Sequence, residues 1–131
     1  MTNRERNERR EAVSRTRVLV AFEAELRAYT EFIAHALNVM CTEAEVHGVE
    51  TGRFASEMER LDPHVVICRS AAADSGKTIA WVEIPPSSWE KSAIRLGDEF
   101  RESENPSLEE LAALIHEAAL LAARKRREEG C

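Results

Sequence analysis

The sequence has few of the residues that indicate a disulfide-linked, metal-binding or membrane-spanning protein. Its 131 residues include three Cys, four His and 5% aromatic residues. No apolar run approaches the ~20 residues of a membrane span, and the spacing of the Cys and His residues is not that of a zinc cluster. We therefore expect no disulfide, metal, cofactor or membrane segment. The N-terminus also lacks the hydrophobic segment of a signal peptide, which favours a cytoplasmic location.

Apolar residues are abundant enough for a folded core. They make up 44% of the chain, against 32% charged residues. A chain of this length can bury roughly two thirds of the surface that it exposes when unfolded. These values predict one globular domain.

Charge is distributed unevenly along the chain. The net charge is −6, yet residues 1–17 hold six Arg against three Glu, and residues 124–131 hold four basic side chains against two Glu. The acidic middle makes a nucleic-acid partner unlikely, because phosphate binding needs clustered Lys and Arg, although the basic ends could contact phosphates or an acidic partner. We divide the chain into a charged arm (1–16), a folded domain (17–123) and a basic tail (124–131).

The first half of the folded domain alternates between strand and helix patterns. Val18–Phe22 and Val65–Cys68 are continuous apolar runs, as in strands that are buried on both faces. Between them lie an amphipathic helix from Glu23 to about Asn38, a short strand at 39–43, and a second helix with Phe54, Met58 and Leu61 that Asp62-Pro63 ends. Such alternation predicts a parallel sheet covered by helices.

The second half departs from this rhythm. Two more strands are predicted at 77–84 and 92–96, and the links before and between them are too short for a full helix. Strands three, four and five could therefore be joined partly as hairpins. Ser107 and Glu110 form a capping box that starts a long last helix. The sequence thus predicts an α/β fold with a mainly parallel, five-stranded sheet and reduced helices between strands three, four and five.

Three segments resemble parts of a response-regulator receiver domain. Arg17–Val20 is similar to the first strand of that family, Leu61–Cys68 to its third strand, and Asn105–Leu111 to the start of its last helix. The resemblance implies a flavodoxin-like, three-layer sandwich. It also implies signalling through a phosphorylated aspartate and a dimer or partner surface.

The phosphotransfer residues of that family are missing at the matching positions. The acidic pair that would hold magnesium is replaced by Phe22 and Glu23, and the acceptor aspartate by Arg69. Arginine cannot accept a phosphoryl group as aspartate does, and its charge would repel magnesium. The Ser or Thr and the Lys of the next two strands are replaced by Glu83 or Ile84 and by Leu96-Gly97-Asp98.

These differences indicate a degenerate pseudo-receiver with no enzymatic activity, a signalling module that acts by protein contacts. Glu23 and Arg69 are candidate residues at the switch point of the sheet, where an ion pair between them would replace the metal. Anion binding by Arg69 is the alternative interpretation.

A second function is suggested by the loop Ala71–Thr78, which matches a permissive phosphate-binding loop. In such a loop Gly76, Lys77 and Thr78 would contact phosphates and magnesium at the start of a helix. The residues after Thr78 are typical of a strand instead, which favours a plain turn. Phosphate or nucleotide binding is therefore the alternative function.

Trp81 and Trp89 flank a proline-containing turn near the expected sheet edge. Exposed Trp residues at an edge often mark an interface, although one of the two should be in the core. An unpaired edge strand also favours self-association, so we predict a homodimer. Cys68 is adjacent to Arg69 but is too far from His64 for catalysis, so core packing is the favoured interpretation.

Overall fold

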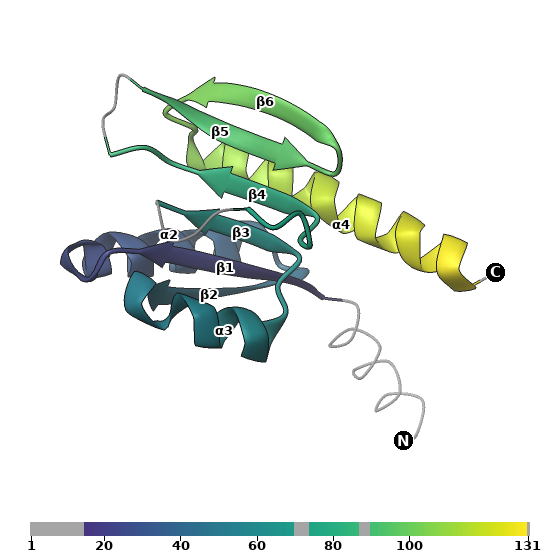
Figure 1. Ribbon diagram of the computed structural model, residues 1–131, viewed down its shortest axis with the longest axis horizontal. Helices are drawn as coiled ribbons and strands as arrows, with labels where there is room; N and C mark the ends of the chain where they lie inside the picture. The colour runs from purple at the N-terminus through teal and green to yellow at the C-terminus, as the bar shows by residue number, and fades with distance from the viewer. Residues whose placement is uncertain (1–14, 70–73, 87–89, 131) are drawn as a thin grey trace.

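A six-stranded mixed sheet forms the centre of the protein in this computed structural model, which describes residues 15–69, 74–86 and 90–130 (Figure 1). The strand order is β2-β1-β3-β4-β5-β6. The first four strands in this order are parallel, whereas β5 is antiparallel to both β4 and β6. The strands are β1 (Thr16–Phe22), β2 (Ala44–Glu50), β3 (Val65–Cys68), β4 (Ala80–Glu83), β5 (Lys91–Leu96) and β6 (Glu99–Glu104).

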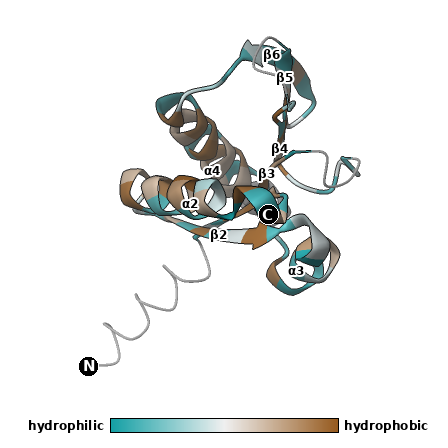
Figure 2. Ribbon diagram, turned by 90° about the vertical axis from the view of Figure 1, so that its left-hand side faces the viewer, coloured by the Kyte–Doolittle hydropathy of each residue, from teal (hydrophilic) through white to brown (hydrophobic). Residues whose placement is uncertain are grey.

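Helices cover the two faces of the sheet unequally. Both α2 (Arg27–Met40) and α4 (Leu108–Gly130) lie on one face, and α3 (Phe54–Leu61) lies on the other (Figure 2). Short 3₁₀ turns, η1 (Ala24–Leu26) and η2 (Thr51–Arg53), precede α2 and α3. Alternate residues of β1 therefore enter two different cores, because side chains of a strand point to opposite faces. Among the described residues, no helix is both long and apolar enough to cross a membrane.

The predicted flavodoxin-like, mainly parallel five-stranded sheet is wrong. The fold differs from that prediction in two features. It has a sixth strand, β6, and β5 is antiparallel to both of its neighbours. The physical reason lies in the links. Only Gly97 and Asp98 separate β5 from β6, and two residues can join antiparallel strands but not parallel ones. The link between β3 and β4 is longer, and those strands are parallel.

The predicted position of the second strand, 39–43, is also wrong. The helix α2 continues to Met40, and β2 occupies Ala44–Glu50. β2 is an edge strand with one face against α2, so its residues alternate between buried Val46 and the partly exposed Glu45 and His47. Val39 and Met40, which the prediction placed in this strand, belong to the last turn of α2.

Other predictions are confirmed. α3 spans the predicted apolar residues and ends at Asp62, which has a left-handed φ of 47°. The hydroxyl oxygen of Ser107 accepts a hydrogen bond from the Glu110 N–H at 3.1 Å, which caps α4.

The helical backbone of α4 continues through residues 124–130 of the predicted basic tail.

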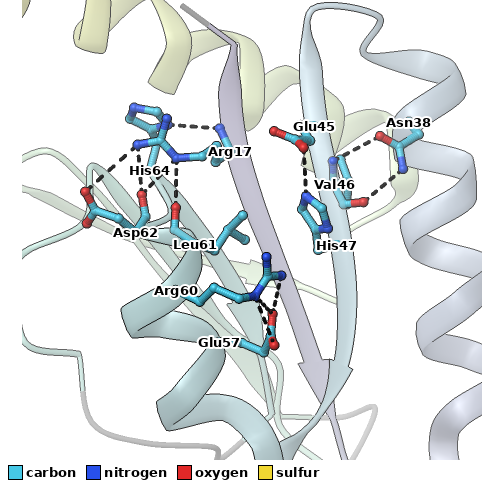
Figure 3. A network of polar contacts seen from close by, with 10 residues as sticks. All are labelled: Arg17, Asn38, Glu45, Val46, His47, Glu57, Arg60, Leu61, Asp62 and His64. Carbon is cyan, nitrogen blue, oxygen red and sulfur yellow. Dashed lines mark hydrogen bonds and ion pairs between the residues drawn. The ribbon is translucent and has the colours of Figure 1, made fainter. Parts of the chain in front are cut away.

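Arg17 links the start of β1 to the end of α3 (Figure 3). Its guanidinium donates hydrogen bonds to the carbonyl oxygens of Leu61 and Asp62, at 2.9–3.1 Å. Its backbone N–H donates to Nδ1 of His64, at 2.9 Å. These bonds satisfy carbonyls that the helix end leaves without an intrahelical donor. They hold the amino-terminal ends of β1 and β3 in place.

Candidate functional site

The candidate switch point lies at the carboxyl ends of β1 and β3, which are neighbours in the sheet. Glu23 directly follows β1, and Arg69 directly follows β3. From this end of the sheet the chain leaves β1 by way of α2 toward β2, and it leaves β3 toward β4, so the two connections run to opposite sides of the site. Open α/β sheets place their ligands at such points.

The structure brings Glu23 and Arg69 together. Nε of Arg69 lies 3.8 Å from Oε1 of Glu23, which is within ion-pair range but too long for a hydrogen bond. The Arg69 side chain is 25% exposed and the Glu23 side chain 36%. Nε of Arg69 is itself buried and has no hydrogen-bond acceptor among the described residues. The pair is therefore held by charge attraction at a half-buried position.

This site does not suit the magnesium ion of a receiver domain. One carboxylate, that of Glu23, faces the site, and a guanidinium lies beside it. Magnesium needs several oxygen ligands and would be repelled by that cation. Within residues 15–69, 74–86 and 90–130, no group of three or more His, Cys, Asp and Glu side chains could hold a metal ion.

The loop with the candidate phosphate-binding residues is only partly described, because Ala71–Ala73 lie outside the described residues. Gly76 has a φ of 78°, and its N–H donates to a carboxylate oxygen of Asp74 at 2.9 Å. The hydroxyl of Thr78 accepts a hydrogen bond from Arg95 at 2.8 Å. The chain then enters β4 instead of a helix, so no helix N-terminus supplies further donors.

Lys77 lines a 430 Å³ pocket together with the second half of α4. Arg124 and Lys125 line the same pocket, and Asp98 is its acidic member. All three cations are exposed. Three exposed positive charges around one pocket, against the carboxylate of Asp98, would attract an anion.

Arg95 is the central polar residue that the sequence analysis missed. It lies in β5 and is 8% exposed. Its guanidinium donates to the Asp74 carboxylate at 2.5 and 3.1 Å, to Thr78 and to the Gly97 carbonyl. Partial burial raises the pKa of Asp74, but the hydrogen bonds from Arg95 and the Gly76 N–H, with the charge of Arg95, lower that pKa below its usual value. A charge inside an apolar strand was the available signal, because buried charges need partners.

The tryptophan and cysteine candidates lie in the core where they are described. Trp81 is 4% exposed and packs edge-on against Phe54 of α3, with ring centroids 6.0 Å apart. Trp89 lies outside the described residues. Cys68 is buried in the core beneath α3, and His64 is at the opposite end of β3, bonded to Arg17.

Comparisons with known proteins give no relative for this fold or site: no family model, no curated protein and no solved structure matches the chain.

Proposed function

We propose that the protein is a non-catalytic, receiver-like signalling module that forms a homodimer and acts through protein contacts. The observation that carries this proposal is an apolar stripe on α2. We define the α2 stripe as Tyr29, Phe32, Val39 and Met40. These four are among the six large apolar side chains that are exposed in the described residues, with exposed fractions of 43–63%.

Helical geometry places these side chains on one side of α2. Phe32 and Val39 are seven residues apart, two turns of the helix, and Tyr29 lies one turn before Phe32. The buried face of the helix consists of other residues, including Ile33 and Leu37. A contiguous exposed apolar stripe of this kind is typical of an interface.

A second copy of the chain is the partner that this stripe fits. A two-fold dimer brings the same surface of both subunits together, so an interface residue meets like residues. The α2 stripe carries no charge, and it can meet its own copy without electrostatic repulsion. The Glu23–Arg69 pair supports the absence of phosphotransfer, because the acceptor position holds an arginine.

Sedimentation equilibrium of the full chain tests the dimer. We expect twice the mass of one chain, and we expect Phe32→Glu to give a monomer. Leu120→Glu is the matched control, because Leu120 is an equally exposed apolar residue on α4, at 56%. A monomeric wild type, or a dimer that Phe32→Glu leaves intact, would contradict the proposed interface.

Intact-mass measurement after incubation with acetyl phosphate and Mg²⁺ tests the non-catalytic part. We expect no gain of a phosphoryl group. A stable gain on an aspartate of the chain would overturn this part of the proposal while leaving the dimer untouched.

Phosphate binding is a second candidate function, favoured by the three exposed cations around the Lys77 pocket. The Thr78 hydroxyl is engaged by Arg95, so the recognition would rest on Lys77, Arg124 and Lys125. We expect phosphate or ATP to raise the melting temperature in a concentration-dependent way if this site operates. Lys77→Ala should remove that rise, whereas Lys91→Ala, an exposed lysine on β5, should not.

A further inference from the structure

The two edges of the sheet differ in how their free backbone groups are covered. At β2, the Asn38 side chain accepts a hydrogen bond from the Val46 N–H and donates one to the Val46 carbonyl, both at 3.0 Å (Figure 3). At β6, no hydrogen bond from any described segment other than β5 reaches the backbone. An uncovered edge strand is a template for pairing with another chain.

The turn between β5 and β6 determines which backbone groups of β6 face outward. Leu96 and Glu99 pair across the two-residue loop, so they exchange backbone hydrogen bonds. Bonding alternates along an antiparallel strand. The N–H and C=O groups of Phe100, Glu102 and Glu104 therefore point away from β5, toward the open edge.

No helix of the described residues covers the other face of β5 and β6. α4 packs against the side of β4 and β5 that carries Val82 and Ile94, and α3 covers β1 and β3 (Figure 2). On the open side, Trp81, Arg95 and Phe100 lie in one row of the register, and Glu83, Ala93 and Glu102 lie in the next. These rows line a pocket of 620 Å³. Phe100 is 80% exposed.

The open side is acidic. Arg95 is paired with Asp74, so the remaining charged side chains of the three strands on this side are Lys91 and the carboxylates of Glu83, Glu102 and Glu104. Lys91 lies 3.8 Å from Glu102 and compensates one of them. The net charge of −2 disfavours a second copy of β6 at this edge. An aromatic ring beside carboxylates is suited instead to Lys or Arg side chains, through ion pairs and cation–π contact.

We propose that an extended basic segment of a partner protein adds as a strand to β6. Its backbone pairs with Phe100, Glu102 and Glu104, and its Lys or Arg side chains lie over Phe100 and Glu102, with the longest reaching the pocket above Ala93. Adjacent strands are about 4.8 Å apart, so a long basic side chain can reach β5 from the added strand. This inference rests on the proposed function, because it names the partner class of the same interaction module.

Titration of the full chain with synthetic peptides tests the inference. The first probe is a peptide that alternates Val with Lys or Arg, the second replaces each basic residue by Glu, and the third is the basic peptide N-methylated at alternate residues. We expect the basic peptide alone to bind, and we expect it to protect the Phe100 and Glu102 amides from hydrogen exchange. Equal binding of the N-methylated peptide would overturn strand addition, because that peptide keeps the charge but lacks the backbone donors.

Charge reversal on the chain provides the second arm. Glu102→Lys and Glu104→Lys should each weaken binding of the basic peptide at least tenfold. Glu59→Lys, an equal charge change at an exposed position of α3, should weaken it less than twofold. Equal effects of Glu102→Lys and Glu59→Lys would overturn the site.

Failure of the inference is distinguishable from failure of the proposed function. Peptide binding is read at β6, and the dimer is read through Phe32→Glu on α2. Loss of peptide binding with an intact dimer rejects the β6 site alone. If Glu102→Lys or Glu104→Lys instead changes the sedimentation mass of the wild-type assembly, β6 pairs with a second copy, and the basic-segment proposal is overturned.

Discussion

The carboxylate of Asp74 accepts hydrogen bonds from two guanidinium nitrogens of Arg95, although 21 residues separate them in the chain. Because Arg95 lies in β5 and Asp74 in the connection that leads to β4, the pair holds this connection against the sheet. Thr78 adds two acceptors to the same guanidinium. The contact adds a side-chain link to the backbone pairing that joins β4 to β5.

Replacement of Arg95 should therefore destabilise the fold strongly. We expect Arg95→Met to lower the free energy of unfolding by about 2–4 kcal/mol, because the Asp74 carboxylate and the Thr78 carbonyl lose the hydrogen bonds that they accept from Arg95. Arg101→Met is the control. Arg101 is 45% exposed and lies 3.8 Å from Glu117, so its loss should cost at most about 0.5 kcal/mol. Urea denaturation measures both, and equal losses would refute a special role for Arg95.

The lowered pKa of Asp74 predicts a pH-dependent contribution to stability. The unfolded chain takes up a proton on Asp74 near the ordinary value of about 3.9, whereas the folded chain does so at a lower pH. The contribution is thus fully present above that range and is lost as pH falls through the folded pKa. We expect the stability difference between wild type and Asp74→Asn to be constant above about pH 5 and to shrink below about pH 4. A difference that stays constant down to pH 3 would contradict the lowered pKa.

Gly48 permits the close approach of β2 and α2. A Cβ at this position would lie 3.0 Å from Cγ2 of Thr30 and 3.5 Å from Cβ of Ala34. We expect Gly48→Ala to lower stability by about 1–2 kcal/mol through overpacking. Thr30→Ser removes Cγ2 but keeps the hydroxyl that donates to the Leu26 carbonyl, so it should relieve the penalty in the double variant. Gly52→Ala, which meets no atom within 4 Å, is the control, and thermal melts compare all four variants.

The Glu23–Arg69 pair should contribute modestly to stability. Both side chains are partly exposed and no hydrogen bond joins them, so we expect Glu23→Ala to lower the free energy of unfolding by about 0.5–1 kcal/mol. Arg69→Asp should cost more, because it places two carboxylates together. Combining Arg69→Asp with Glu23→Arg restores opposite charges and should recover part of the loss. If melts of Glu23→Ala and Arg69→Asp both match wild type, the pair does not stabilise this end of the sheet.

The parts of the fold that were predictable are those with a strong local pattern. β1 and β3 are buried on both faces, so their apolar runs identify them. The start of α4 is encoded by Ser107 and Glu110, three residues apart. β6 has no such pattern, because an edge strand exposed on both faces needs only Phe100 as a large apolar residue.

The contacts of the candidate site could be predicted only where the order and direction of the strands could be predicted. Placing Glu23 and Arg69 together required the ends of β1 and β3 alone, and both strands were identified from their sequence. The Asp74–Arg95 pair depends on the antiparallel pairing of β5 with β4, and the sequence left open whether these strands are parallel or joined as a hairpin. Likewise, the pocket between Lys77 and α4 depends on where α4 crosses the sheet. No local sequence pattern encodes that position.

Asn38 also has a consequence for how many chains can join at the sheet. If β6 of one molecule could pair with β2 of the next, the contact would be head-to-tail, and nothing would stop growth into a filament. Because Asn38 occupies both backbone groups of Val46, a docking strand would find no free donor or acceptor at that residue of β2. This contact disfavours pairing at β2, and with it the growth of a polymer, while β6 stays available for an extended segment.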